Sequence, residues 1–412
     1  MIKAATVAVD LALPTLHPVD AVLRNFFAAH RELGQRDRAF IAETVFCVLR
    51  HKRLLEELVP QSTAQNLIIA ALIKIQGYSL SQLDPLLGSG TRDWLLSVKS
   101  ANIEDLPAAV KMSLPDWLYE RLVGETSELN AAAFGRAMLN PAPLDLRVNT
   151  VVANREGVLL DLRSSGFEAS ATRYSPVGIR LKGKPAINRH VLFSSGAIEV
   201  QDEGSQLLGY LVAPKRREMV VDFCAGAGGK TLLMGALMQS QGRLYAFDTS
   251  EKRLKNLNPR LKRSGLSNVH PQLIASENDI KVKRLAGKID RVLVDAPCSG
   301  FGTLRRNPDL KWRQTPQAID ELAVKQRTIL AAAATLVKPG GRLVYATCSV
   351  LRQENRNIVE GFLASQPSFR QVSCKQVLDE SDIALDSGEY LELRPEVHET
   401  DGFFAAVMRK SD

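Results

Sequence analysis

Apolar and polar residues follow one another along the chain in three successive rhythms, and each rhythm predicts a different kind of structure. From about residue 18 to residue 105, apolar residues recur three and four positions apart, which is typical of amphipathic helices. Residues 67–75 are apolar on nearly every side, as the central helix of a bundle would be. Three glycines and one proline interrupt this pattern over residues 77–90. We therefore expect an all-helical first domain.

A shorter, mixed pattern occupies residues 108–195. Residues 144–150 alternate between apolar and polar as a β-strand does, and residues 156–165 repeat at helical spacing. These segments predict a small α+β module. Arg147 and Asn149 on its first strand are candidates for contacts with phosphate or a base. The alternative is that both are ordinary exposed strand residues.

From residue 196 onward, strand, turn and helix follow one another repeatedly, which predicts an α/β domain wound around a parallel sheet. The chain therefore divides into three expected domains, which cover residues 1–107, 108–195 and 196–412. The expected strands of the last domain are residues 219–223, 244–247, 292–295, 343–347 and 402–408, with a turn at residues 339–341.

Two of these strands run directly into a cysteine. The strand at residues 292–295 ends in Asp295 and is followed by Cys298, and the strand at residues 343–347 is followed by Cys348. In open α/β sheets, ligands bind beyond the carboxyl ends of the strands, so we expect both thiols and the carboxylate at one edge. This arrangement suggests thiol chemistry. For a lone cysteine at a strand end, the alternative is a small, partly buried apolar residue.

The turn between the first strand and the first helix of this domain, from Cys224 to Thr231, is rich in glycine. Such a turn lets a ligand approach the backbone closely, beside the free N–H groups of the helix end. Asp248 ends the next strand, where an acidic side chain accepts hydrogen bonds from ribose hydroxyls. The two features indicate a ligand that contains adenosine, either a dinucleotide or S-adenosylmethionine. A phosphate-binding P-loop is disfavoured because its motif needs glycine where this chain has Cys224.

Composition and charge limit the possible partners and the cellular compartment of the protein. The net charge of +8 and the isoelectric point near 9.2 favour an acidic partner, nucleic acid first. Five cysteines, and no histidine cluster near any of them, indicate a reducing compartment without structural zinc. No apolar run approaches the roughly 18 residues of a membrane helix, and the first residues lack a secretory pattern. We expect a cytoplasmic protein without membrane or metal.

Motifs spread over nearly the whole chain match one known family. They lie at residues 37–50, 114–118, 146–150, 201–206, 224–231, 295–300, 305–312, 347–349 and 401–404. On these motifs the chain resembles the Sun/NSUN-type RNA cytosine-5 methyltransferases, and among them the bacterial 16S ribosomal RNA branch with an N-terminal NusB-like domain. The Asp295 to Cys298 motif together with Thr347 and Cys348 is the most specific part of the resemblance.

The resemblance implies a Rossmann-like class I methyltransferase domain, preceded by an all-helical NusB-like RNA-binding domain and a small α+β (RRM-like) module. It implies methyl transfer from S-adenosylmethionine to carbon 5 of a cytosine in RNA. The implied substrate is 16S ribosomal RNA, unassembled or partly assembled, and the implied state is a monomer. Four basic residues after Cys298 are expected to hold RNA phosphates, namely Arg305, Arg306, Lys311 and Arg313.

The resemblance also assigns roles to individual residues. Cys348 is the nucleophile that attacks carbon 6, and Cys298 is the base that releases the product. Asp295 forms hydrogen bonds with the edge of the cytosine ring. Lys230 either lowers the pKa of a cysteine thiol or orients the cytosine. The expected cofactor contacts are Cys224, Ala225, Gly226, Ala227, Gly228, Gly229, Lys230, Asp248, Arg253, Ser276 and Asp295.

The chain departs from the family's pattern in two regions. The family usually has proline at the position of Ala227 and alanine at that of Gly226, so we expect a more flexible turn here. Near the adenine the family tends to carry an aspartate, where this chain has Ser276, followed by Glu277, Asn278 and Asp279. Which of these four touches the adenine stays open.

Other functions fit the motifs less well. A transfer RNA cytosine-5 methyltransferase and a non-catalytic RNA-binding ribosome assembly factor that keeps the fold are the alternatives. A DNA cytosine-5 methyltransferase usually has glutamine where this chain has Ser299 and lacks the second cysteine. A nicotinamide-dependent dehydrogenase leaves Cys298 and Cys348 without a role.

Overall fold

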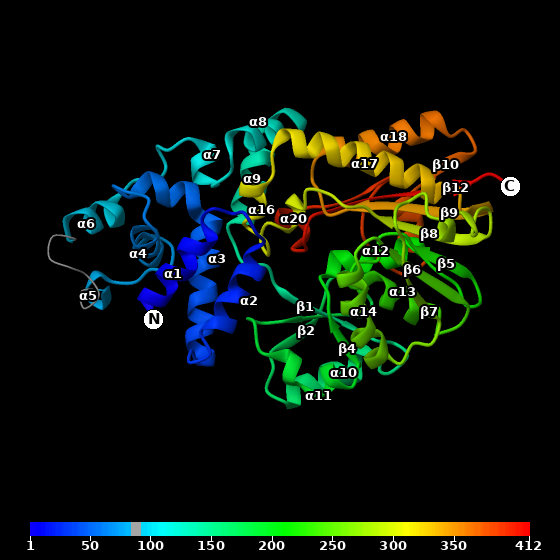
Figure 1. Ribbon diagram of the computed structural model, residues 1–412, viewed down its shortest axis with the longest axis horizontal. Helices are drawn as coiled ribbons and strands as arrows, with labels where there is room; N and C mark the ends of the chain where they lie inside the picture. The colour runs from blue at the N-terminus through cyan, green and yellow to red at the C-terminus, as the bar shows by residue number, and fades with distance from the viewer. Residues whose placement is uncertain (84–91) are drawn as a thin grey trace. The chain divides into compact units, whose positions relative to one another are not determined.

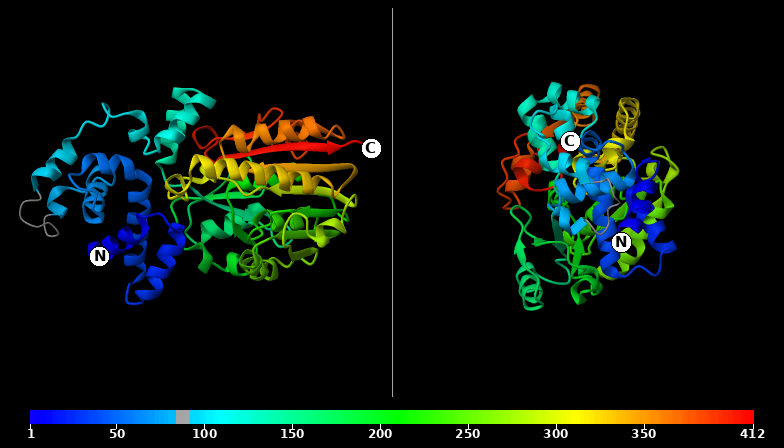
Figure 2. Two further views of the ribbon diagram at one scale, coloured as in Figure 1. Left: turned by 45° about the horizontal axis from the view of Figure 1, so that its top comes forward. Right: turned by 90° about the vertical axis from the view of Figure 1, so that its left-hand side faces the viewer.

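A computed structural model of the chain describes residues 1–83 and 92–412. The chain forms two compact units. The first comprises Met1–Pro141 and Thr303–Pro316, and the second comprises Ala142–Gly302 and Gln317–Asp412 (Figure 1 and Figure 2). A segment from the middle of the chain thus belongs to the first unit. The break predicted at residues 77–90 falls partly on residues 84–91, which lie outside the described residues.

The first unit is helical, as the apolar spacing predicts. Its helices are α1 (Ile2–Ala12), α2 (Val19–Ala29), α3 (Gln35–Leu58), α4 (Ala64–Lys74), α5 (Leu80–Leu83), α6 (Arg92–Ser100), α7 (Ala108–Lys111), α8 (Asp116–Glu125), α9 (Glu128–Met138) and α16 (Leu310–Arg313). α4 is apolar all round because α1, α3 and α6 pack against it, and every residue from Leu67 to Ile73 is buried. Its described residues contain no strand, so the all-helical expectation is confirmed.

The long helix α3 is interrupted at His51, whose φ of −107° and ψ of 15° are not helical. Two backbone carbonyl groups beside this kink bond to side chains of the segment that returns to the unit. Trp312 Nε1 donates to the Leu49 carbonyl at 2.8 Å, and Lys311 Nζ donates to the Arg50 carbonyl at 2.8 Å. Two hydrogen bonds therefore attach the returning segment, Thr303–Pro316, to α3 beside its kink.

Two of the basic residues expected to hold RNA phosphates are buried at this attachment. Lys311 is 1% exposed and Arg305 is 7% exposed, and the Arg305 carbonyl accepts a hydrogen bond from Arg50 Nη2 at 3.0 Å. Burial, with the charge of Arg50, lowers the pKa of Lys311 well below its usual range. The expectation of phosphate contacts is therefore wrong for Arg305 and Lys311. For Arg306 and Arg313 it stays a prediction.

The second unit begins with a four-stranded antiparallel sheet of order β2-β3-β1-β4. Its elements are β1 (Leu144–Val148), α10 (Arg155–Ser164), β2 (Ala169–Ala171), β3 (Gly178–Leu181), the 3₁₀ helix η2 (Ile187–Arg189), α11 (Val191–Ser194) and β4 (Ile198–Val200). One face packs apolar side chains such as Leu146 and Val148 against α10. The other face is polar but buried, with Asp145, Arg147 and Glu199.

Arg147 and Asn149 join this small sheet to the rest of the second unit. Arg147 donates from Nη1 to the Gly229 carbonyl at 2.6 Å, and Asn149 donates from Nδ2 to the carbonyls of Gly196 and Ser264 at 3.0 and 2.9 Å. Arg147 is 1% exposed and Asn149 is 2% exposed. Arg147 and Asn149 are therefore neither exposed strand residues nor available for contacts with phosphate or a base, because both are buried and bound to backbone carbonyls of the second unit.

A larger sheet of order β10-β12-β9-β8-β5-β6-β7 forms the rest of the unit, and β11 pairs with β12. The strands are β5 (Met219–Asp222), β6 (Arg243–Asp248), β7 (Val269–Leu273), β8 (Ile289–Asp295), β9 (Val337–Thr347), β10 (Phe369–Val372), β11 (Leu391–Leu393) and β12 (Phe403–Lys410). β5 to β9 are parallel, and β12 is antiparallel to its neighbours. The strand order reverses between β5 and β8, where such sheets bind ligands.

Helices cover both faces of the larger sheet (Figure 1). They are α12 (Glu203–Val212), α13 (Gly229–Leu237), α14 (Glu251–Ser264), α15 (Ile280–Lys283), α17 (Pro316–Ala334), α18 (Arg356–Ser365), α19 (Cys374–Asp379) and α20 (Pro395–His398), with 3₁₀ helices η3 (Phe301–Thr303) and η4 (Arg352–Glu354). α17 and α18 pack on one face, and α12, α13 and α14 pack on the other. Successive strand residues alternate between the two cores, as Val344 and Tyr345 do.

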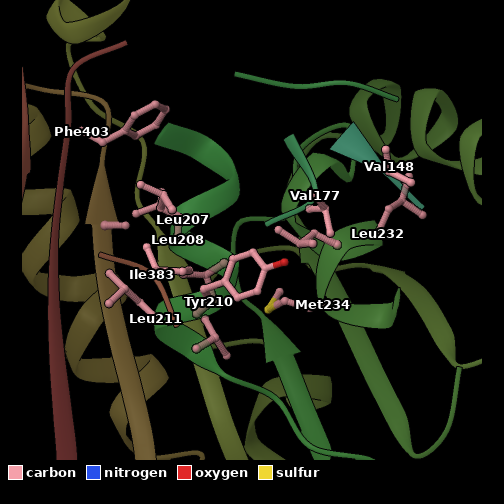
Figure 3. Close-up of a cluster of buried hydrophobic side chains, with 14 of the residues drawn as sticks. Val148, Val177, Leu207, Leu208, Tyr210, Leu211, Leu232, Met234, Ile383 and Phe403 are labelled. Atoms are coloured by element: carbon pink, nitrogen blue, oxygen red, sulfur yellow. The ribbon is translucent and has the colours of Figure 1, made fainter. Parts of the chain in front are cut away.

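The small sheet and the larger sheet share one of these cores. Figure 3 shows Leu207, Leu208 and Leu211 of α12 in this cluster, which also contains Val148 and Val177 from the small module. The α+β module is therefore packed into the second unit. No helix among residues 1–83 and 92–412 is long and apolar enough to cross a membrane.

Candidate active site

Because β8 and β9 are neighbours, the loops that follow them meet at the carboxyl edge of the sheet. The Sγ atoms of Cys298 and Cys348 lie 3.4 Å apart, and both residues are half-buried. The Gly302 amide donates to the Cys348 carbonyl at 2.8 Å, which holds one loop against the other. Asp295 is the last residue of β8. The structure thus brings together the two thiols and the carboxylate that the sequence placed at one edge.

Lys230 reaches this edge from the first turn of α13. Its Nζ lies 2.7 Å from Asp295 Oδ2. Burial alone would lower the pKa of Lys230, but the Asp295 carboxylate, the hydrogen bond to it and negative charge on Cys348 raise it above the usual value. Lys230 therefore stays cationic beside the two thiols.

The surroundings of Cys298 keep it protonated. The hydrogen bond to Cys348 and burial, followed by the charge on Cys348 and the nearby carboxylates of Glu354 and Asp295, raise the pKa of Cys298 well above its usual range. Cys298 is therefore held as a thiol, and its S–H can donate to the Sγ atom of Cys348.

The glycine-rich turn lies after β5, on the other side of the point where the strand order reverses. Gly226 and Gly228 have φ values of 57° and 82°. A Cβ atom at Gly228 would lie 2.0 Å from Leu257 Cδ1, so only glycine fits there. A Cβ atom at Gly226 would meet nothing within 4 Å, so the backbone is open to a ligand at this point.

Two arginine side chains donate hydrogen bonds to carbonyl groups of this turn. Arg260 of α14 donates from Nη1 to the Ala227 carbonyl at 2.7 Å, and Arg147 donates to the Gly229 carbonyl at 2.6 Å. The missing proline at position 227 is thus compensated by hydrogen bonds, which argues against the more flexible turn that the sequence led us to expect. Neither Arg260 nor its contact was expected from the motifs.

Asp248 lies beside the turn at the end of β6. It is 5% exposed, and its two oxygens accept hydrogen bonds from the amides of Gly226 and Ser250 at 2.8 and 2.7 Å. Each carboxylate oxygen keeps a further lone pair for a ribose hydroxyl. The Arg253 guanidinium is 4.0 Å from Asp248, with 64% of its side chain exposed.

The four candidates for the adenine contact differ in what they already bind. Asp279 accepts hydrogen bonds from the amides of Ala275 and Lys281, which lower its pKa and begin α15. Ser276 Oγ accepts a hydrogen bond from the Asn278 amide at 3.2 Å. These contacts shape the loop after β7, and the structure does not bring Ser276 into contact with the cysteine pair.

Comparison with known proteins identifies the family. Residues 209–409 match the family model described as 16S rRNA methyltransferase RsmB/F, and residues 114–188 match the ferredoxin-like domain of RsmF/B-like methyltransferases. A Synechocystis protein described as probable ribosomal RNA small subunit methyltransferase B is 31% identical, over 92% of this chain and 92% of its own. The chain belongs to the RsmB/F family. The resemblance drawn from the sequence motifs is thereby confirmed.

Solved structures place the RsmB/F chain in the same fold. The crystal structure of PH0851 is similar with a TM-score of 0.80 and 27% identity, over 99% of this chain and 98% of that one. A methyltransferase homolog protein from Pyrococcus horikoshii gives a TM-score of 0.64 and 28% identity, over 74% of this chain and 97% of that one. The Rossmann-like methyltransferase fold is confirmed.

One buried carboxylate of this family member was not singled out from the sequence. Asp222 ends β5, is 1% exposed and accepts a hydrogen bond from Thr231 Oγ1 at 2.6 Å. Within the described part of the chain its Oδ1 has no hydrogen-bond partner. Burial, with the charges of Asp295 and Asp248, raises the pKa of Asp222 to about 7 against the opposing bond from Thr231. Its place at the end of the first predicted strand was the available signal.

A second missed carboxylate, Glu354 of η4, is completely buried between the two cysteine loops. In the sequence no motif distinguishes this glutamate from the others. No group of three or more His, Cys, Asp or Glu side chains in residues 1–83 and 92–412 is placed to hold a metal ion.

Proposed function

We propose that this RsmB/F protein transfers a methyl group from S-adenosylmethionine to carbon 5 of a cytosine in 16S ribosomal RNA. The observation that carries the proposal is the pair of thiols 3.4 Å apart, Cys298 and Cys348, beside the ion pair of Lys230 and Asp295. Family membership supports an RNA substrate and methyl transfer. The name of the Synechocystis relative supports the small-subunit RNA.

The chemistry of cytosine explains why two thiols are useful. Carbon 5 is a poor nucleophile in the aromatic ring. Addition of a thiolate to carbon 6 breaks the aromaticity and makes carbon 5 nucleophilic, and after methylation a proton remains on carbon 5. A base must remove this proton before the thiolate can leave, so the reaction needs one nucleophile and one base.

The resemblance assigns Cys348 as nucleophile and Cys298 as base, and the raised pKa of Cys298 supports this order. The Cys348 thiolate forms the Sγ–C6 bond, and the electron pair of the C5–C6 double bond moves to carbon 5. Once Cys348 is bonded to carbon, the largest cause of the raised pKa of Cys298 is gone, and Cys298 can release its proton to water. Its thiolate then takes the carbon 5 proton, the C–H electron pair restores the double bond, and Cys348 leaves as a thiolate.

Asp295 and Lys230, at the same edge of the sheet, orient the cytosine. Asp295 accepts a hydrogen bond from the amino group of the cytosine. Lys230 fixes the Asp295 carboxylate at 2.7 Å and stabilises negative charge on Cys348. A base can reach both sulfur atoms only after it leaves its stack, so we expect an unstacked loop of the RNA as the target.

The residues of the turn fit the cofactor. S-adenosylmethionine supplies an electrophilic methyl group on a sulfonium ion. The open backbone at Gly226, the N–H groups at the start of α13 and the Asp248 carboxylate would hold its polar groups. We propose that Cys224–Lys230 and Asp295 line its site, with Arg253 and Ser276 toward the nucleoside.

The rest of the chain has proposed roles as well. We assign residues 1–107 to RNA binding as a NusB-like domain, residues 108–195 to a linking and RNA-binding module, and residues 196–412 to methyl transfer. We expect a monomer that acts in the cytoplasm on free or partly assembled small-subunit RNA.

The deciding experiment is methyl transfer from labelled S-adenosylmethionine to protein-free small-subunit RNA, large-subunit RNA and transfer RNA, with mass spectrometry of the nucleosides. We expect 5-methylcytosine in the small-subunit RNA. Label in transfer RNA alone would change the substrate. Cofactor binding without label in any RNA would favour the assembly factor.

Replacement of each cysteine tests the two roles. We expect Cys298→Ala to accumulate a covalent RNA–protein adduct, because the methylated base cannot be released, and Cys348→Ala to form none. Denaturing gels with labelled RNA measure both. An adduct in Cys348→Ala alone would reverse the assignment.

A further inference from the structure

The carboxylate of Glu354 is surrounded by hydrogen-bond donors. Its Oε1 accepts from the Ser299 amide at 2.8 Å and from Gln326 Nε2 at 3.1 Å. Its Oε2 accepts from Ser299 Oγ at 2.6 Å and from Ser349 Oγ. Glu354 is 0% exposed. All four donors are neutral, and they come from three separate parts of the chain.

Two of these partners are the residues that directly follow the cysteines. Ser299 follows Cys298, Ser349 follows Cys348, and the two serine hydroxyls are 3.1 Å apart. One buried carboxylate therefore bridges the loop after β8 and the loop after β9. Glu354 therefore holds the residue next to each cysteine, and the positions of these residues set the distance between the two thiols.

The residues before the cysteines are held by neighbours of the same carboxylate. Gln326 Nε2 also donates to the Pro297 carbonyl at 2.9 Å. Asn355, next to Glu354, accepts from Thr347 Oγ1 at 2.5 Å and donates to the Ser349 carbonyl at 3.0 Å. Each cysteine is thus fixed on both sides, by Glu354 together with Gln326, which binds it, and Asn355, which follows it in the chain.

Burial of a carboxylate is costly, and the fold alone does not require it here. Apolar residues of similar volume often stabilise a protein as well as a buried charged network does. A network satisfied at all its acceptors instead defines one geometry for the groups attached to it. We propose that Glu354 is a positioning residue of the methyl-transfer reaction, which holds Cys298 and Cys348 at their working separation. This inference rests on the proposed function.

Glu354→Gln tests the proposal, because glutamine offers one acceptor oxygen in place of two. We expect kcat to fall about 10- to 100-fold, as for misplacement of reacting groups by around 1 Å. KM for RNA and for S-adenosylmethionine should stay within about twofold, because none of the four donors touches the cofactor turn. A fall in kcat no larger than that of the control below would overturn the proposal.

Glu218→Gln is the matched control. Glu218 binds Arg291 at 2.6 and 3.1 Å at the opposite, amino end of the sheet. We expect it to lower the unfolding temperature while kcat per folded molecule stays unchanged. If Glu354→Gln behaves in the same way, with lower stability and normal kcat, Glu354 is structural only.

Ser299→Ala and Ser349→Ala give a milder test in case Glu354→Gln folds poorly. Each serine variant should resemble a weak form of the alanine variant of the cysteine before it. We expect Ser299→Ala to raise the amount of trapped RNA adduct and Ser349→Ala to slow adduct formation. Equal effects of the two variants on adduct formation and release would contradict a positioning role.

A measurement without RNA separates this inference from the proposed function. Glutathione disulfide can oxidise the two thiols to a Cys298–Cys348 disulfide and is itself reduced to two glutathione molecules. We expect Glu354→Gln to lower the equilibrium constant of this exchange by about tenfold or more, because the thiols are less well placed. Unchanged exchange would overturn the inference even if 5-methylcytosine forms. Absence of 5-methylcytosine with wild-type protein would refute the proposed function, while the exchange measurement would still show whether Glu354 sets the spacing of the two thiols.

Discussion

Asp222 shows how strongly one residue can depend on its surroundings. Its side chain is fully enclosed at the end of β5, and burial raises its pKa to about 7 from an ordinary value of 3.8. Between these values the folded protein keeps a proton that the unfolded chain has lost. The stabilising effect is complete below about pH 3.8 and is lost as the pH rises through 7.

We therefore predict that Asp222→Asn stabilises the cofactor-free protein at pH 8 and that the gain shrinks toward pH 4. The asparagine keeps an oxygen for the Thr231 hydroxyl and removes the buried charge. The gain can reach about 4 kcal/mol, since each pKa unit corresponds to about 1.4 kcal/mol. Urea unfolding at pH 8, 6 and 4.5 measures it.

Asp290→Asn is a control of opposite sign. Burial acts to raise the pKa of Asp290, but the bonds to Lys338 and to the Met219 amide lower it overall. Its replacement should destabilise the protein at neutral pH and matter less in acid. A loss of stability in Asp222→Asn that is equal at every pH would rule out the charge effect.

The sequence motifs point to some residues of the site and miss others. The meeting of Cys298, Cys348 and Asp295 at one edge could be predicted because these residues stand in short motifs at strand ends. Glu354 could not, because its importance comes from four donors that approach it only in the folded chain. Arg147 was predicted on a strand, but its burial depends on contact with Gly229 in another part of the unit.

At the scale of elements, the glycine-rich turn depends on α14. Arg260 donates to Ala227 and also pairs with Glu199. We predict that Arg260→Met weakens S-adenosylmethionine binding about tenfold, because the turn loses a buried charge-assisted bond. Ala227→Pro in the same chain should restore most of the affinity, since proline fixes φ where the hydrogen bond is missing. Calorimetric titration measures both variants.

Arg263→Met is the matched control, because Arg263 binds the same Glu199 without touching the turn. It should leave cofactor affinity within about twofold of wild type. Equal losses in Arg263→Met and Arg260→Met would assign the effect to Glu199 and refute the role of the carbonyl bond.

The limits of elements were harder to predict than their existence. The basic segment after the second strand forms α14, because its charged and apolar residues have helical spacing. A turn was expected at residues 339–341 from one proline and two glycines. The structure includes these residues in β9 (Val337–Thr347), but the pairing with β8 passes from Val337 directly to Arg342, and the pairing with β12 begins at Arg342. Gly340 has a φ of 69°, so the strand is irregular at the point where the turn was expected.

At the scale of the whole molecule, the chain crosses between its two units three times. It passes from the first unit to the second after Pro141, returns at Thr303 and leaves again after Pro316. Cys298 is only five positions before the return. The basic composition of the returning segment suggested RNA contacts, and sequence alone could not show that its side chains would be used against α3.

The last prediction concerns this returning segment. Trp312 is bound to the Leu49 carbonyl through Nε1 and lies near Lys52 and Lys311, whose Nζ atoms are 5.3 and 5.0 Å from its ring centre. Trp312 is half-buried. We predict that Trp312→Ala lowers the free energy of unfolding by about 2 kcal/mol, because the ring loses its packing and its N–H bond. Trp312→Phe keeps a ring and loses the N–H, so it should cost about 1 kcal/mol.

Limited proteolysis can locate the effect in the chain. In the full chain, residues 303–316 are packed within the first unit and should resist cleavage. A chain that starts at residue 142 lacks Leu49 and Arg50, so the same segment loses both carbonyl acceptors and its packing. We expect cleavage within residues 303–316 in the shortened chain and, more slowly, in Trp312→Ala. Equal protection in all three proteins would mean that contacts other than those with α3 hold the segment.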